Sequence, residues 1–187
     1  MKYEVLTYGN GALRNKAKKV EAVTEELKEL ALDMIETMYA EAGVGLAAEQ
    51  VGKDEAMFVI DILPLPEGLK YTERFTDDNI KMPLVVINPV ITEQEGECVC
   101  KEGCLSVPGI TASITRSEKL VLKYLDLNGE TQILQANGLL ADAIQHENDH
   151  LNGILIVDRM TPMQKVMYKS KLKKMVRENK SMLNAKL

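Results

Sequence analysis

The sequence predicts an α+β fold, in which antiparallel β-sheets pack around one central helix and further helices lie toward the N- and C-termini. Two stretches carry apolar residues at helical spacing, one before residue 43 and one from Leu139 onward. Between them, several short strand-like runs follow one another, separated by turn residues. Strands in the middle of the chain with helices toward both ends indicate the α+β class. No internal repeat or low-complexity segment divides residues 1–187, so we expect a single domain.

The N-terminal part predicts one helix followed by a glycine-rich turn. Residues 4–8 alternate weakly and suit a short strand or a lead-in segment. Thr24 is a good N-cap for a helix that ends before Gly43. The apolar residues of this helix lie at helical spacing, at positions 27, 30, 31, 34, 35 and 38. The stretch 43–52, GVGLAAEQVG, has glycines at both ends and one between, which indicates backbone shaped for close approach.

The middle of the chain predicts the strands. Residues 57–62 suit a buried strand, and residues 84–91 a strand that Asn88-Pro89 interrupts, at a sheet edge or a turn. Between them, segment 63–83 contains three prolines and is expected to be a loop or a lengthened hairpin. Asn128-Gly129 marks a hairpin turn between the last two of the later strands. Those later strands are expected around 97–101, 110–115, 119–127 and 130–136.

The last part of the chain returns to helical spacing. From Leu139, apolar residues describe a helix that stops near Asn152-Gly153. Thr161, Pro162 and Gln164 offer a capping box with proline at the first helical position, and so predict a final helix over about 162–182. We expect the methionines at 34, 38, 163 and 167 to fill the core.

Hydropathy and cysteine content narrow the class of protein. No run approaches the roughly 18 apolar residues of a membrane span, and the first ten residues lack the apolar centre of a signal peptide. The three clustered cysteines are too few for a disulfide framework, so we expect a cytoplasmic protein with reduced thiols and no membrane partner.

The net charge of −5 is unevenly distributed. Residues 161–187 contain eight basic residues and one acidic residue, whereas the remainder has 15 basic and 27 acidic residues. A basic tail on an acidic body is a candidate docking element for RNA or another polyanion. A solvated helix face explains the same charges.

The strongest chemical motif is HExxH, formed by residues 146–150 on the predicted helix. His146 and His150 are one helical turn apart, so both imidazoles project from one face and can reach one cation. Glu147 lies beside them, where it can accept a proton from a metal-bound water. These are the only two histidines in the chain, so their spacing predicts a metal site.

A catalytic site needs a third protein ligand and an open position for water. The metzincin pattern would place a third histidine where Ile156 stands, so it fails. A downstream carboxylate as in thermolysin-like peptidases leaves Glu178 as the candidate, and an upstream thiolate leaves Cys104, within EGCLS at 102–106. A closed, non-catalytic site that adds Cys100 to Cys104 and the histidines is the remaining alternative.

Three segments together resemble the peptide deformylase family. They are GVGLAAEQ at 43–50, EGCLS at 102–106 and QHENDH at 145–150. The likeness extends to LTYGNGALRNKAKKV near the start, Val107-Pro108-Gly109, Arg116 and the HLNGILIVDRM that begins at His150. It covers nearly the whole chain, with 63–83 the least similar stretch.

The resemblance implies a site and a reaction. Cys104, His146 and His150 would bind the metal, and Glu147 would relay the proton from water to the departing amine. Two groups, the Gln50 side-chain amide and the Leu105 backbone N–H, would stabilise the oxyanion. The reaction would be hydrolysis of the N-terminal formyl group of new polypeptides, releasing formate.

The resemblance also implies partners and a cofactor. Gly45 would leave room for an extended substrate backbone, and Val44 and Leu139 would line an apolar pocket for the formyl-methionine side chain. Fe(II) would be the native metal, with Ni(II), Co(II) or Zn(II) able to replace it, although the donor set alone suggests zinc most readily. The substrates would be formyl-methionyl peptides, and the basic final helix would dock on the ribosome; no DNA partner is expected.

Three residues depart from the family pattern: Glu49, Asp142 and Asn148. Asp142 lies one turn before His146, and we hypothesise that it makes the side-chain pocket or its rim more polar, which the peptide preferences of Asp142→Ile would test.

The remaining polar residues have simpler expected roles. Cys98 and Cys100, two apart on one strand face, are expected to be small core residues. Asp149 is expected to orient a histidine or to pair with Arg116.

Overall fold

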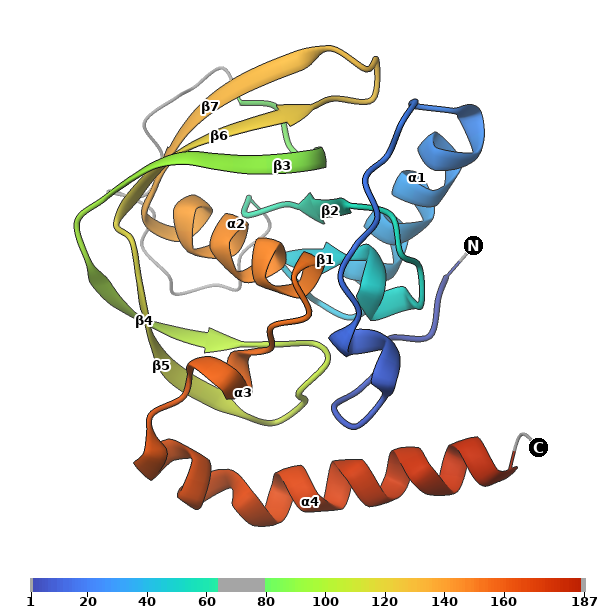
Figure 1. The fold of residues 1–187 in the computed structure, drawn as a ribbon, viewed down its shortest axis with the longest axis vertical. Coiled ribbons are helices and arrows are strands. Elements are labelled where there is room, and N and C mark those ends of the chain that lie inside the picture. The colour runs from blue at the N-terminus through green and yellow to red at the C-terminus, as the bar shows by residue number, and fades with distance from the viewer. Residues whose placement is uncertain (1, 64–79, 186–187) are drawn as a thin grey trace.

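The computed structural model describes residues 2–63 and 80–185 of the chain, with side chains as far as Ser181 in the last helix. Five antiparallel strands form one sheet in the order β1-β2-β3-β6-β7, and β4 pairs with β5 in a second, two-stranded sheet (Figure 1). The strands are β1 Gly45–Ala47, β2 Met57–Ile60, β3 Leu84–Glu95, β4 Cys98–Gly103, β5 Thr111–Arg116, β6 Lys119–Leu125 and β7 Thr131–Asn137. The helices are η1 Gly11–Arg14, α1 Glu25–Ala40, η2 Ala48–Val51, α2 Gly138–Leu151, α3 Ile156–Arg159 and α4 Pro162–Ala185. The predicted α+β class is confirmed.

The helix α2 lies between the five-stranded sheet and the β4–β5 pair (Figure 1). Its apolar side chains, including Leu140 and Ile144, join a buried cluster with Phe58 on β2 and Leu122 on β6. Burying a side chain of this size contributes about 1.5–3 kcal/mol. The packing therefore fixes α2, and with it the two histidines, against a rigid sheet.

Strand β2 is buried on both faces, which explains its unbroken apolar sequence. Phe58 and Ile60 face the cluster around α2, whereas Met57 and Val59 face a second cluster around α1. As predicted, α1 begins after Thr24, whose hydroxyl accepts a hydrogen bond from Leu27 N at 3.3 Å.

The predicted interruption of the third strand at Asn88-Pro89 is wrong, because β3 runs through it to Glu95. The strand absorbs the irregularity as a register shift between Ile87 and Val90 against β6. Asn88 takes a left-handed conformation, with φ of 50°. Its side chain bonds both the N–H and the carbonyl of Val20, at 2.9 and 2.7 Å. The Asn88 side chain thereby pairs the backbone groups of a distant segment, and the register shift accommodates Pro89, which has no N–H to donate to the ladder.

The final helix α4 packs along the outside of the β4–β5 pair and the N-terminal segment. The predicted capping box is present: Thr161 Oγ1 accepts from Gln164 N at 3.3 Å, and Gln164 Oε1 accepts from Thr161 N at 2.9 Å. Further along, Tyr168 donates to the Thr111 carbonyl, and the Asn179 amide donates to Thr7 Oγ1 at 2.8 Å.

Several smaller expectations differ from the structure. Residues 4–8 form no strand, and β1, η1, η2 and α3 were not predicted. Of the four methionines expected in the core, Met34 and Met38 are fully buried, but Met163 and Met167 are exposed. Most of the segment 63–83 lies outside the described residues. Among the described residues, no helix is long and apolar enough to cross a membrane.

Candidate active site

The helix α2 presents His146 and His150 on one face, as their spacing predicts. Their ring centroids are 5.2 Å apart. Cys104, directly after β4, lies beside them, with its sulfur 3.2 Å from His150 Nε2. Ligand atoms of Cys104, His146 and His150 all lie within 4.8 Å of one another. The structure therefore brings together three of the residues that the sequence singled out as ligands.

A buried ion-pair network orients His146. Its Nδ1 lies 2.8 Å from a carboxylate oxygen of Glu102, which leaves Nε2 to face Cys104 and His150. Arg116 donates to both oxygens of Glu102, at 2.7 and 3.0 Å, and to Asp149 at 2.6 Å. Burial alone would raise the pKa of Glu102, but the hydrogen bonds from His146 and Arg116 lower it to about 2. Glu102 is thus a carboxylate that fixes the tautomer and the ring orientation of His146.

The role of Glu102 was not predicted, although its spacing from Cys104 could have indicated it. It stands two residues before Cys104, so the extended backbone directs both toward the same side. The expected pair of Asp149 with Arg116 is present, and Arg159 also donates to Asp149 at 3.0 Å.

Glu147 lies beside the ligand cluster, in the wall of the same cavity. It is 4% exposed, and its Oε2 has no hydrogen-bond partner among the described residues. Burial raises the pKa of this carboxyl to about 7, against the attraction of His146. A carboxyl with a pKa near neutrality can both accept and return a proton.

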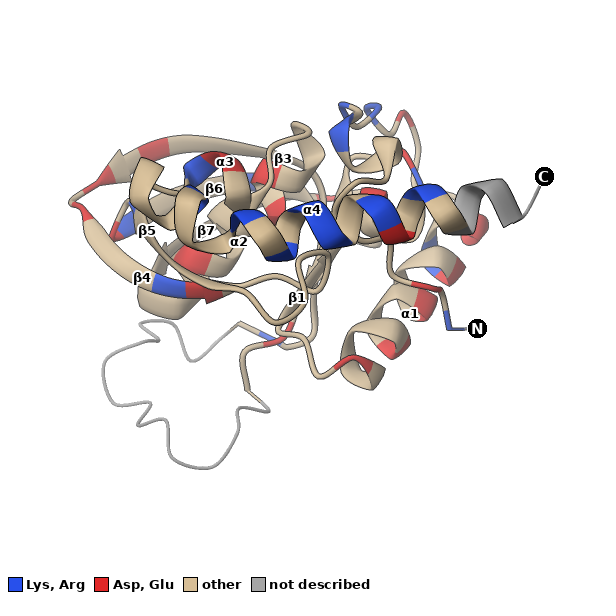
Figure 2. Cartoon of the chain, turned by 90° about the horizontal axis from the view of Figure 1, so that it is seen from below, with Lys and Arg blue, Asp and Glu red and all other residues tan. Residues whose placement is uncertain are grey.

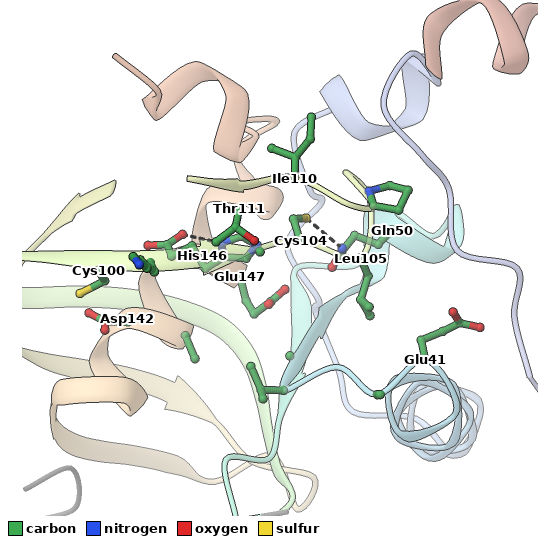
Figure 3. A pocket seen from close by; sticks show the side chains of 18 of the residues that line it. Glu41, Gln50, Cys100, Cys104, Leu105, Ile110, Thr111, Asp142, His146 and Glu147 are labelled. Carbon is green, nitrogen blue, oxygen red and sulfur yellow. Dashed lines mark hydrogen bonds and ion pairs between the residues drawn. The ribbon is translucent and has the colours of Figure 1, made fainter. Parts of the chain in front are cut away.

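Gln50 is held so that its amide nitrogen points at the cluster. Its Oε1 accepts from Ala47 N at 2.8 Å, and its Nε2 donates to Ser106 Oγ at 3.1 Å. The same nitrogen lies 3.8 Å from the Cys104 sulfur (Figure 3). The short 3₁₀ turn η2 supplies this orientation, because it folds the Gln50 side chain back onto the backbone of β1.

A cavity of about 560 Å³ opens beside these groups. Its lining includes Leu105 and the three residues predicted to contact a substrate, Val44, Gly45 and Leu139. Asp142 and Cys100 lie side by side in its wall (Figure 3).

The alternative metal sites do not assemble in the structure. Glu178 is exposed on α4 and lies 3.6 Å from Lys174. Cys100 groups with Cys98 and Asp142 instead of with Cys104 and the histidines. The expectation that Cys98 and Cys100 are core residues is wrong, because both are partly exposed and neither belongs to an apolar cluster.

The residues present fit a divalent metal ion. One sulfur and two imidazole nitrogens are the donors that zinc, iron, cobalt and nickel accept. The cluster is open to the cavity, and next to it the Glu147 Oε2 is buried without a partner among the described residues. Three protein donors and an open fourth side are the pattern of a catalytic metal site.

A buried carboxyl and an oriented amide, both beside a three-donor metal site, define a metal-dependent hydrolase. The family model described as polypeptide deformylase matches residues 2–166. The chain belongs to the peptide deformylase family, whose function is removal of the N-formyl group from nascent polypeptides.

Relatives and solved structures agree with this assignment. The peptide deformylase of Dictyoglomus thermophilum is 47% identical over 156 residues, which span 83% of this chain and 91% of that protein. The enzyme of Neisseria gonorrhoeae is 44% identical over 170 residues, covering 91% and 93% of the two chains. The crystal structure from Thermus thermophilus superposes with a TM-score of 0.82 at 36% identity, covering 95% of this chain and 99% of that one.

Proposed function

We propose that Cys104, His146 and His150 hold the catalytic metal of this deformylase and that Glu147 is its proton carrier. The convergence of the three donor atoms within 4.8 Å, beside a buried carboxyl, is the observation that carries this proposal. A divalent cation bound there supplies Lewis-acid activation of water and of the formyl oxygen. Glu147 accepts the proton of the attacking water and delivers it to the amine as the C–N bond breaks.

The other residues around the cavity bind and orient the substrate. The Gln50 amide, held by Ala47 and Ser106, donates to the oxygen of the formyl group as negative charge develops on it. The backbone N–H of Leu105 is the second donor. Val44 and Leu139 contact the methionine side chain, and the missing side chain at Gly45 leaves room for an extended peptide backbone.

We propose Fe(II) as the native metal, with Ni(II), Co(II) or Zn(II) as replacements. The one-sulfur, two-nitrogen donor set accepts all four ions, and the resemblance to the family favours iron. We further propose that the substrates are formyl-methionyl nascent chains and that the enzyme works in the cytoplasm, docked to the ribosome through α4.

Formate release from formyl-Met-Ala-Ser tests the reaction and the proton carrier together. Protein purified and assayed without oxygen, so that an Fe(II)–thiolate centre stays reduced, is expected to release formate. Glu147→Ala is expected to lose at least a hundredfold in kcat, within the range that general acid–base catalysis contributes. Glu93→Ala, which changes an exposed glutamate on β3, is the matched control. Equal rates for Glu147→Ala and the wild type would remove Glu147 from the mechanism.

A further inference from the structure

Cys98, Cys100 and Asp142 form a second cluster of metal-binding side chains in the described part of the chain. The two cysteines stand two residues apart on β4, so both face α2, where Asp142 lies. Their sulfurs are 3.0 Å apart, and Cys98 Sγ lies 3.6 Å from Asp142 Oδ1. Ligand atoms of all three residues lie within 4.8 Å of one another. Figure 3 shows the Asp142 carboxylate directed toward Cys100 at one end of the cavity.

The charge of Asp142 has no cationic partner in this cluster. Asp142 makes no ion pair with a described residue, and its hydrogen-bond contacts are with the thiols of Cys98 and Cys100. The Arg116 guanidinium, which attracts the Asp142 charge, is already bonded to Glu102 and Asp149. A half-buried carboxylate with two thiols as neighbours is a set of three potential anionic donors without a counter-charge.

The backbone favours a metal over a disulfide at this position. Residues two apart on an extended strand have Cα atoms roughly 6.7 Å apart, at the upper limit of what a disulfide spans. Two thiolates on one tetrahedral zinc ion lie roughly 3.7 Å apart, given Zn–S bonds of about 2.3 Å. The 3.0 Å sulfur separation therefore needs an opening of less than about 1 Å to accept the ion.

We propose that Cys98, Cys100 and Asp142 form a second metal site, which binds Zn²⁺ or another thiophilic divalent ion. Three protein donors leave a coordination position for water or for a substrate group. Burial raises the pKa of both thiols, so only an ion with high affinity for thiolate displaces their protons, which disfavours Mg²⁺ and Ca²⁺.

An ion at this site would act on the substrate cavity. Cys100 and Asp142 line that cavity, on the same side as Leu139. A bound ion occupies space at this end and places positive charge there, so it inhibits turnover of peptides whose side chains reach it. This consequence rests on the proposed function, whereas binding of the ion does not.

Zinc stoichiometry of the metal-free protein tests the site without any activity measurement. The wild type is expected to bind two Zn²⁺ per chain, one at each cluster. Cys98→Ser is expected to bind one ion, at the cluster that contains Cys104. Cys104→Ser is also expected to bind one ion, at the cluster that contains Cys98. The double variant is expected to bind none tightly. One equivalent in both the wild type and Cys98→Ser would overturn the proposal.

Co²⁺ provides a spectroscopic check on the ligands. Thiolate-to-cobalt charge-transfer absorbance in the near ultraviolet grows with the number of thiolates bound. Cys104→Ser is expected to retain the absorbance of two bound thiolates, those of Cys98 and Cys100. Cys98→Ser is expected to have a lower absorbance, because its two-thiolate site is lost. Val99→Ser is the matched control, because Val99 lies between the cysteines on the opposite, exposed face of β4. A Cys98–Cys100 disulfide found by mass spectrometry in the freshly isolated, metal-free protein would also overturn the proposal.

Added Zn²⁺ then tests the effect on turnover in the holoenzyme, with the metal at the first cluster quantified before and after. The wild-type rate of formate release is expected to fall at Zn²⁺ concentrations that leave Cys98→Ser active. Equal inhibition of the wild type and Cys98→Ser by Zn²⁺ would show that an ion at the second cluster does not inhibit turnover. Absence of formate release without added zinc would count against the proposed function and leave the stoichiometry test intact.

Discussion

At the scale of single residues, the absence of a side chain at Gly45 makes space for the Glu147 carboxyl. A Cβ added at this position would lie 2.8 Å from Glu147 Cδ and 2.9 Å from its Cγ, closer than real side chains approach. Gly45 therefore makes room for the side chain of Glu147, besides the room that we propose it leaves for a substrate backbone. The sequence indicated close approach around 43–52, but the group that approaches comes from a helix about 100 residues later in the chain.

Gly45→Ala is expected to lower kcat by about a hundredfold, because displacement of a reacting group by about 1 Å has an effect of this size. Formate release under saturating substrate measures it. Gly11→Ala is the control, since a Cβ there meets no atom within 4 Å. A wild-type kcat for Gly45→Ala would contradict the prediction and show that formate release tolerates a displaced Glu147 carboxyl.

Glu49 is a second residue whose environment the sequence did not reveal. It is 1% exposed, and neither carboxylate oxygen has a partner among the described residues. Burial raises its pKa to about 8, and repulsion by Glu147 adds to the effect. Between the unfolded pKa of about 4.5 and the folded pKa of about 8, the folded state holds a proton that the unfolded state has lost, so stability falls as pH rises.

Glu49→Gln removes this pH dependence. The variant and the wild type are expected to have similar free energies of unfolding near pH 4.5, and the variant is expected to be about 1–4 kcal/mol more stable at pH 8. Urea unfolding across this pH range measures the difference. Glu29→Gln, an exposed change on α1, is the control, and parallel curves for Glu49→Gln and the wild type would contradict the prediction.

At the scale of elements, the β4–β5 pair and α2 hold the site together through Arg116. The guanidinium comes from β5, Glu102 from β4 and Asp149 from α2, and all three are nearly buried. Removing one member would leave another charge buried and unpaired, which destabilises proteins by about 3–5 kcal/mol. The network therefore couples the fold of the small sheet to the orientation of His146.

Glu102→Gln keeps the size of the side chain but removes its charge and one acceptor. We expect metal affinity to fall 10–100-fold, because the ring of His146 loses its orienting carboxylate. Competition with a chelator for Zn²⁺ measures this affinity, in a Cys98→Ser background so that one site is counted. Glu93→Gln on the exposed side of β3 is the control, and an unchanged affinity for Glu102→Gln would show that the ring is held by packing alone.

Elements with strong periodicity were predictable, and those whose partners are distant in sequence were not. The apolar spacing of α1 and α2, the Asn128-Gly129 turn and the Thr161 capping box act locally, so the sequence was sufficient for them. Strand β3 continues through Asn88-Pro89 because its pairing with the distant β6 resumes after a register shift. Likewise β1 is three residues long and exists because β2 pairs with it. Such tertiary interactions override local propensity.

At the scale of the whole molecule, charge distinguishes the final helix from the body, and packing fixes the helix against it. Within Pro162–Ala185 there are seven basic residues and one acidic residue, and their charges mark α4 in Figure 2. The inner face of α4 is fixed by Leu172 and by the Asn179 amide, which bonds Thr7 and the Tyr8 carbonyl. Anchored in this way, the helix presents its outer lysines as a rigid basic surface.

This surface predicts salt-sensitive binding to the ribosome. Lys169, Lys173 and Lys180 are exposed on α4, and changing all three to Gln removes charge without removing an inner contact. If each lysine contacts one RNA phosphate, the variant is expected to bind more weakly at low salt, and the slope of log affinity against log salt to decrease by about 3. Co-sedimentation with ribosomes over a range of KCl concentrations measures both quantities. The control removes the same charge from the body, by changing Lys16, Lys19 and Lys119 to Gln. Because overall charge is matched, equal weakening in the two triple variants would mean that net charge, and not the position of α4, governs binding.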